Sequence, residues 1–192
     1  MSILLSVLTP AVPSRFAQLQ KLSDEVARQC HEIGTQDVEH LIFCDNKKRT
    51  VGQKRDNLLR MARGKYVAFV DDDDWIAPEY VHQILLASKD APDVITFRQR
   101  AYVDALSSEI EFKLGNPNEP FNAGGITRRN AWHVCAWRRT IAIQSAFPAS
   151  NYGEDWAFAA PLCAAKNLVE VHIAKVLHEY HHSSKTTEAP PP

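Results

Sequence analysis

The sequence lacks an excess of charge of either sign. Its 22 lysines and arginines nearly balance 23 aspartates and glutamates, which leaves a formal net charge of −1. A protein dedicated to nucleic acid usually carries a broad basic surface. The composition therefore disfavours that class, and any charged site must come from local clusters.

Long apolar runs and paired cysteines are also lacking. No stretch approaches the run of about 20 apolar residues that a membrane-spanning helix needs. The apolar start has no basic segment and is interrupted by Pro10, which favours a first strand over a signal peptide. The four cysteines show no C-x-x-C spacing. We therefore expect free, buried thiols in a cytoplasmic protein.

At 192 residues the chain is long enough for one sizeable core and short for two. Apolar runs and helical periodicity alternate along its first half. This alternation predicts one α/β domain over residues 1–182, with a central, mostly parallel sheet flanked by helices and a small antiparallel portion. The polar, proline-ended residues 183–192 are expected to form a flexible tail.

The expected elements follow from these patterns and from the turn residues between them. Strands are expected at residues 3–8, 38–44, 65–70, 93–97, 133–137, 168–173 and 176–180. Helices are expected at residues 15–31, 53–62, 78–88 and 153–166, with a hairpin in 98–112 and a loop at 115–125.

Four consecutive aspartates, Asp71, Asp72, Asp73 and Asp74, follow the strand expected at residues 65–70. Ligands of open α/β sheets bind outside the carboxyl ends of the strands. Neighbouring carboxylates repel one another unless a positive group joins them, and Mg²⁺ or Mn²⁺ is commonly held by one or two carboxylates plus substrate phosphates. The alternative is a solvated acidic turn that caps the next helix, but apolar residues on both sides favour the metal.

Two further clusters carry groups that suit the same chemistry. Lys54 and Arg55 lie at an expected helix start, where basic groups suit a diphosphate, although they could equally form an exposed basic face. Glu154 and Asp155 also begin a helix, so either could act as a general base or merely complement the helix dipole.

Three histidines lie close together near the end of the chain, at positions 178, 181 and 182. Imidazole nitrogens complete many divalent metal sites, but such a cluster can also be a surface feature. In an extended segment His178 and His182 point one way and His181 the other, so only part of the trio can serve one ion.

These residues resemble a known family, the inverting glycosyltransferases of family 2 with the GT-A fold. The resemblance covers residues 5–184 and is most specific in R-D-N at 55–57, G-K-Y-V-A-F-V-D-D-D-D-W at 64–75 and G-E-D-W at 153–156. These segments are similar to the R-N, A-x-G, L-D-x-D-D-W and E-D motifs of the family. The short chain is similar to members encoded by bacterial viruses, which would place it in the host cytoplasm.

The resemblance implies a UDP-sugar donor, with glucose the first sugar expected, and a Mn²⁺ or Mg²⁺ cofactor. The acceptor hydroxyl stays open between glycan, protein and modified nucleic acid, and so does the oligomeric state. The first loop, residues 9–14, lacks the aromatic partner for uracil that the family commonly has.

By the same resemblance the residues fall into three roles. The base would be Asp155 or Glu154; the nucleotide-sugar would meet Thr9, Pro10, Asp45, Lys54, Arg55, Asp71 and Asp72; and the metal would meet Asp73, Asp74 and either His178 or His181.

Two other functions compete with this assignment. A nucleotidyltransferase shares the sheet and the metal chemistry, but it usually begins with a glycine-rich loop, and residues 9–14 contain no glycine. A non-catalytic nucleotide-sugar or carbohydrate binding module would keep the fold without turnover. Arginines and tryptophans between residues 128 and 139 could hold a sugar, a phosphate or single-stranded nucleic acid, although tryptophans at this spacing are more often core.

Overall fold

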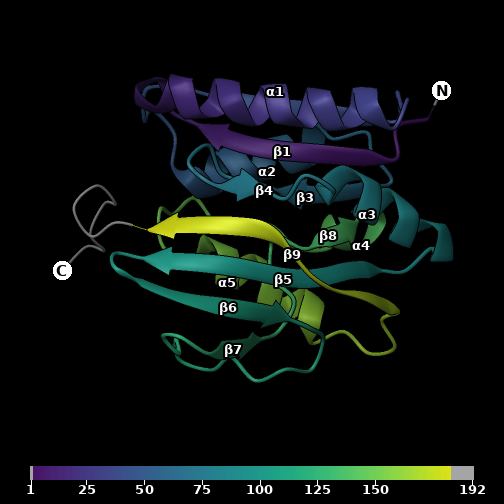
Figure 1. Ribbon diagram of the computed structural model, residues 1–192, viewed down its shortest axis with the longest axis vertical. Coiled ribbons are helices and arrows are strands. Elements are labelled where there is room, and N and C mark those ends of the chain that lie inside the picture. The colour runs from purple at the N-terminus through teal and green to yellow at the C-terminus, as the bar shows by residue number, and fades with distance from the viewer. Residues whose placement is uncertain (1, 183–192) are drawn as a thin grey trace.

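Strands and helices alternate through the first half of the chain, as the sequence predicts (Figure 1). The computed structural model describes residues 2–182, so the tail expected at 183–192 lies outside the described residues. The first half contains β1 (Leu5–Ala11), the 3-10 turn η1 (Pro13–Arg15), α1 (Phe16–Glu32), β2 (Val38–Cys44), α2 (Val51–Met61), β3 (Tyr66–Phe69), β4 (Trp75–Ile76), α3 (Tyr80–Ala87) and η2 (Ser88–Asp90). The second half contains β5 (Val94–Val103), β6 (Leu106–Phe112), β7 (Ile126–Arg129), β8 (Ala136–Arg138), α4 (Arg139–Ala142), α5 (Glu154–Cys163) and β9 (Glu170–His182).

The strands within residues 2–182 form one mixed sheet in the order β2-β1-β3-β8-β5-β6-β7, with β9 paired to both β4 and β5. β1 pairs in parallel with β2 and β3, and β5 pairs in parallel with β9. The pairs that involve β8, and the β5–β6 hairpin, are antiparallel. The α/β domain with helices on both faces of the sheet is therefore confirmed.

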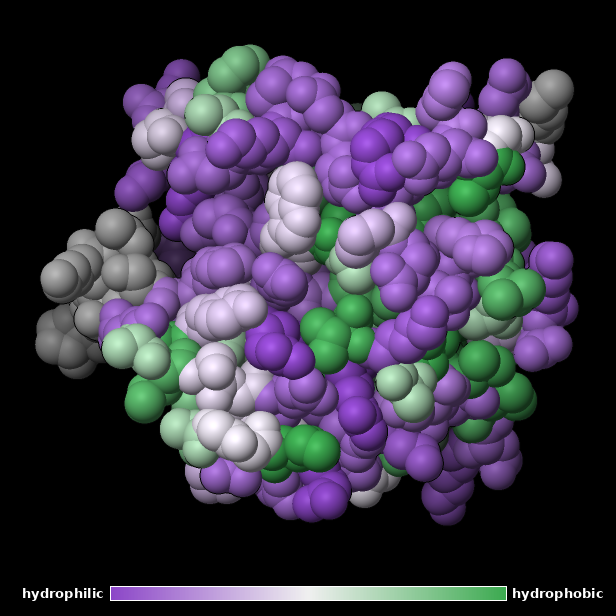
Figure 2. Space-filling model, viewed as in Figure 1, coloured by the Kyte–Doolittle hydropathy of each residue, from purple (hydrophilic) through white to green (hydrophobic). Residues whose placement is uncertain are grey.

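The two faces of the sheet carry separate apolar clusters. Tyr66 and Ala68 pack on one face with α1 and α3, while Val67 and Phe69 pack on the other with α2 and α5. Because successive side chains of a strand point to opposite faces, β3 reads as a continuous apolar run. The outward surface of α1 is mostly hydrophilic, as the top of Figure 2 shows.

Several expected boundaries and positions were wrong. The helix expected to begin at Pro78 begins at Tyr80. The strand expected at 133–137 begins only at Ala136, as β8, because residues 133–135 form a turn in which the Cys135 amide donates to the Trp132 carbonyl. The two late strands are one strand, β9.

Two side chains also depart from their expected burial. The helical spacing of apolar residues in 15–31 groups Phe16 with the buried Leu19, Leu22 and Val26, but Phe16 is 63% exposed, because at about 100° of rotation per residue it lies well off the centre of their face. Cys44 is exposed, whereas Cys135 is buried; all the cysteines are free, as expected.

No helix within residues 2–182 is both long enough and apolar enough to cross a membrane.

The amino end of α2 is docked tightly against the loop that leads into α5. The Gly52 amide donates to the Ser150 carbonyl, and the Val51 amide donates to the Asn151 side chain. A Cβ at residue 52 would lie 1.9 Å from the Pro148 carbonyl oxygen, so only glycine permits this approach.

We expect Gly52→Ala to lower the free energy of unfolding by about 2–3 kcal/mol, because the loop must move to admit a methyl group. Urea unfolding at constant pH measures this change. Met61→Ala is the matched control: Met61 is 62% exposed at the other end of α2, and its truncation should change stability by less than about 0.5 kcal/mol. Equal stability of the two variants would contradict the tight docking.

Candidate active site

The acidic run follows β3 at the carboxyl edge of the sheet, and its four side chains differ in exposure. Asp72 and Asp74 are buried, while the side chains of Asp71 and Asp73 are 28% and 32% exposed. Burial raises the pKa of Asp72, and burial with the neighbouring carboxylates raises the pKa of Asp73 to about 6 and that of Asp74 well above its usual range. Such a cluster needs positive partners.

Arg55 of α2 is the first of these partners. Its guanidinium is buried and donates to both carboxylate oxygens of Asp71 at 2.8 and 2.7 Å and to Glu154 at 2.5 Å. Although burial alone would lower the pKa of Arg55, the charges of Asp71 and Glu154 raise it. The arginine that sequence analysis assigned to the nucleotide thus joins the acidic run to the start of α5.

Arg15 is the second partner, and the sequence analysis missed it. From η1 it donates to Asp72 at 3.0 Å and lies 2.9 Å from Asp73, while the Val12 amide donates to the other Asp72 oxygen at 2.8 Å. A lone arginine after a short loop carries no pattern in the sequence that would reveal a partner 57 residues away. The first loop is therefore closed onto the acidic run.

Lys54 of α2 and Asp45, which follows β2, lie together. The Lys54 Nζ is 2.8 Å from Asp45 and donates to the Ala11 carbonyl at 2.8 Å. The hydrogen bond from Lys54 lowers the pKa of Asp45. This contact ties α2 to the ends of β1 and β2.

Thr9 and Pro10, assigned to the uracil by the resemblance, are both buried within β1. The Thr9 hydroxyl lies 2.9 Å from the His40 ring on β2, and burial lowers the pKa of His40 to about 4. The Thr9 hydroxyl is therefore already paired with His40 inside the sheet.

The late histidines His178 and His181 lie in different environments. His178 is fully buried on β9, its Nε2 lies 3.5 Å from Asp74, and neither ring nitrogen has a hydrogen-bond partner among the described residues. Burial lowers the pKa of His178 to about 4, so the ring is neutral near pH 7. His181 instead stacks on Tyr102, with its ring centroid 4.9 Å away, and only its backbone amide reaches Asp74.

Glu154 and Asp155, at the start of α5, also have different surroundings. Glu154 is buried against Arg55, and its burial raises its pKa. Asp155 is partly exposed, and its Oδ2 accepts a hydrogen bond from the Trp132 indole at 3.2 Å. Asp155 is therefore the carboxylate with an open side, and Glu154 the one held inside.

The chemistry of the donors fits a hard divalent cation. Asp73 and Asp74 offer carboxylate oxygens, and His178 offers ring nitrogens without a partner. Among residues 2–182, no three His, Cys, Asp or Glu side chains already form a ligand set. A cation at these residues would therefore depend on further oxygens, such as those of a diphosphate.

Comparison of the fold with solved structures finds similar chains. Staphylococcus aureus TarS, residues 1–349 in complex with UDP, matches with a TM-score of 0.68 and 17% identity over 95% of this chain and 62% of that one. The complex of the same protein with UDP-GlcNAc matches with a TM-score of 0.66 and 14% identity over 97% of this chain and 62% of that one. This likeness confirms the GT-A type of fold, and the chain spans less than two thirds of the length of these relatives.

Two sequence comparisons agree with this GT-A type of fold. Bacillus subtilis (strain 168) EpsH, which bears the name of a glycosyltransferase, is 34% identical over 58 residues, or 27% of this chain and 17% of EpsH. The model of the family described as glycosyl transferase family 2 matches residues 21–145, which is more than half of the 192 residues. The chain belongs to glycosyl transferase family 2.

Proposed function

We propose that this protein transfers a sugar from a UDP-sugar to an acceptor hydroxyl with inversion at the anomeric carbon, with Mn²⁺ or Mg²⁺ as cofactor. The observation that carries the proposal is the Arg55 bridge, because it fixes a carboxylate cluster that suits a cation beside a helix start that offers an open carboxylate. TarS has been crystallised with UDP and with UDP-GlcNAc, which supports a UDP-sugar donor for a chain of the same fold.

The metal would be held by Asp73, Asp74 and His178. When bound, the cation would stabilise the negative charge that develops on the departing diphosphate. Of the two candidate histidines we choose His178, since its ring faces Asp74 while the His181 ring packs on Tyr102. Asp71 and Asp72, with Lys54 and Asp45, would surround the nucleotide.

Asp155 would act as the general base. The acceptor oxygen attacks the anomeric carbon, the bond from that carbon to the diphosphate oxygen breaks with its electron pair leaving on UDP, and the acceptor proton passes to the Asp155 carboxylate. The Trp132 indole, which donates to Oδ2, would orient this carboxylate. Glu154 would act indirectly, by holding Arg55.

Two substitutions separate binding from chemistry. Asp73→Ala should abolish the part of UDP affinity that depends on Mn²⁺, whereas Asp155→Asn should keep UDP affinity within about twofold and lower UDP release from UDP-glucose or UDP-GlcNAc by about 10²-fold or more. Calorimetry and an assay of UDP release measure the two effects. Asp56→Ala, which breaks an ion pair with Arg60 within α2, is the control.

Parent protein that binds UDP equally with and without Mn²⁺ would contradict the metal site. Parent protein that binds a UDP-sugar but never releases UDP would instead favour the non-catalytic binding module. Release of pyrophosphate from a nucleoside triphosphate would favour the nucleotidyltransferase.

Arg15 provides an independent test of the cation site, because its single guanidinium forms ion pairs with both Asp72 and Asp73. Arg15→Ala should destabilise the protein by about 1–3 kcal/mol, since it leaves Oδ1 of the buried Asp72 carboxylate without its donor, while the Val12 amide still donates to Oδ2. Added Mn²⁺ should then raise the melting temperature at least twice as much as in the parent, because the cation replaces the lost charge. Arg60→Ala, which breaks only an exposed pair with Asp56, should leave the Mn²⁺ effect unchanged. Equal Mn²⁺ effects in all three proteins would exclude a cation at these aspartates.

A further inference from the structure

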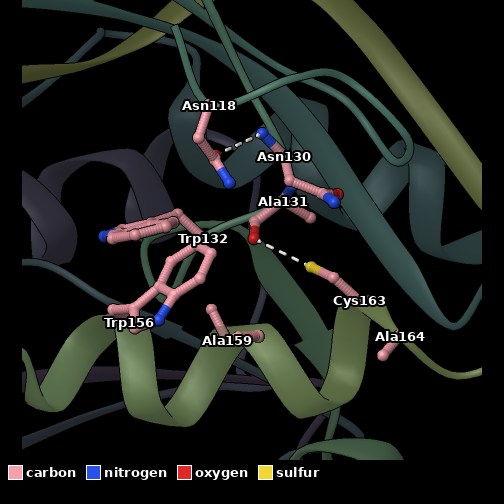
Figure 3. Close-up of a pocket in the computed structure, with 9 residues that line it drawn as sticks. Asn118, Asn130, Ala131, Trp132, Trp156, Ala159, Cys163 and Ala164 are labelled. Atoms are coloured by element: carbon pink, nitrogen blue, oxygen red, sulfur yellow. Dashed lines mark hydrogen bonds between the residues drawn. The ribbon is translucent and has the colours of Figure 1, made fainter. Parts of the chain in front are cut away.

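A cleft of about 190 Å³ runs along one side of α5 (Figure 3). It lies between Trp156, Ala159 and Cys163 of α5 on one side and Asn118, Asn130 and Trp132 on the other. Since α5 begins at Glu154, the cleft starts beside the proposed base and extends toward the other end of the helix.

Two indoles form one end of this cleft. The rings of Trp132 and Trp156 have centroids 5.6 Å apart and planes inclined by 39°, and Trp156 is 48% exposed (Figure 3). Trp137, the other tryptophan considered for a sugar site, is buried in the core and donates its indole hydrogen to the Trp132 carbonyl at 2.9 Å. The structure therefore separates the tryptophan that belongs to the core from the two that open onto the cleft.

Asn118 adds a polar group that is held in place. Its Oδ1 accepts the Asn130 amide at 3.1 Å, which fixes the side chain, and its amide nitrogen points toward the indole pair (Figure 3). No protein acceptor within residues 2–182 takes the hydrogens of that nitrogen. An oriented donor above flat apolar rings is a feature of sites that recognise small polar ligands.

The cleft is joined directly to the proposed base. The Trp132 indole donates to Asp155 Oδ2 at 3.2 Å, and the Trp156 backbone amide donates to Asp155 Oδ1 at 2.7 Å. A ligand lying against these two rings would therefore lie beside the carboxylate that must take the acceptor proton.

We propose that this cleft is the acceptor subsite and that it binds a sugar ring, so that the acceptor is a glycan. The inference rests on the proposed function. A pyranose combines a flat face of C–H groups, which packs on an indole, with hydroxyls that accept from an amide, and the cleft offers both. Its volume is below the range of about 300–1,000 Å³ of sites that enclose larger ligands, which suits one ring.

Other acceptors fit the lining less well. None of the lining residues is charged, whereas a nucleic acid acceptor would need basic groups for its phosphates. A second copy of the chain could also cover Trp156, and sedimentation of the parent and of Trp156→Ala distinguishes that occupant from a sugar.

The test uses the full chain saturated with UDP and Mn²⁺. Saturation-transfer NMR with the methyl β-glycosides of glucose, galactose and N-acetylglucosamine, and with the β1,4-linked disaccharides of glucose and of N-acetylglucosamine, reports sugar contact and affinity. We expect at least one probe to bind the parent and Trp156→Ala to raise its Kd at least tenfold, while Trp156→Phe, which keeps a flat ring, raises it less. Asn118→Asp keeps the acceptor for the Asn130 amide but removes the donor, and should raise the Kd at least threefold. Met61→Ala should bind as the parent does, and UDP affinity should stay within twofold in every variant.

The outcomes separate this inference from the function on which it rests. Parent protein that fails to bind UDP overturns the proposed function. Parent protein that binds UDP but no sugar probe, or Trp156→Ala protein that binds the probe as well as the parent, overturns the acceptor subsite alone. Dimerisation of the parent in sedimentation that Trp156→Ala abolishes would show that a second copy occupies the cleft, and would also overturn it.

Discussion

The site depends on one buried cation, the guanidinium of Arg55. It is 4% exposed and is paired from two directions, with Asp71 after β3 and with Glu154 at the start of α5. Removing one partner of a buried ion pair commonly costs about 3–5 kcal/mol, because the remaining charge is left in a medium of low polarity. The bridge therefore fixes the acidic run relative to α5, and with it the distance from the proposed cation to the proposed base.

The other half of the site comes from the end of the sheet. Ile76 of β4 pairs with His178 of β9, which brings the late histidine back to the acidic run across about a hundred residues of chain. The backbone amide of His181 then donates to Asp74. The Arg55 bridge and this strand pair hold opposite ends of the run, so Asp71 to Asp74 are constrained by the fold as well as by charge.

Local patterns in the sequence were sufficient for the regular elements near the site. An apolar run followed by four aspartates placed the acidic cluster at the end of β3, and a helix start placed Glu154 and Asp155 together. Periodicity could not show that β9 is continuous, because Ala174 and Lys175 interrupt the apolar pattern where the register with β5 shifts, between Ile173 opposite Phe97 and Val176 opposite Arg98. It also could not reveal contacts made across the fold, such as those of Arg15 with Asp72 and Asp73 or of Trp132 with Asp155. The role of Gln29 was hidden for the same reason: it is a polar residue on the buried side of α1, where it bonds to the backbone of Ala77 and Val81.

A crystal structure of the protein with Mn²⁺ and UDP tests the central claim most directly. Anomalous scattering from manganese should appear beside Asp73, Asp74 and His178 and in contact with the diphosphate, with Arg15 moved away from Asp73 and the Arg55 bridge intact. Manganese or UDP bound elsewhere, with Arg15 still on Asp73, would contradict the account.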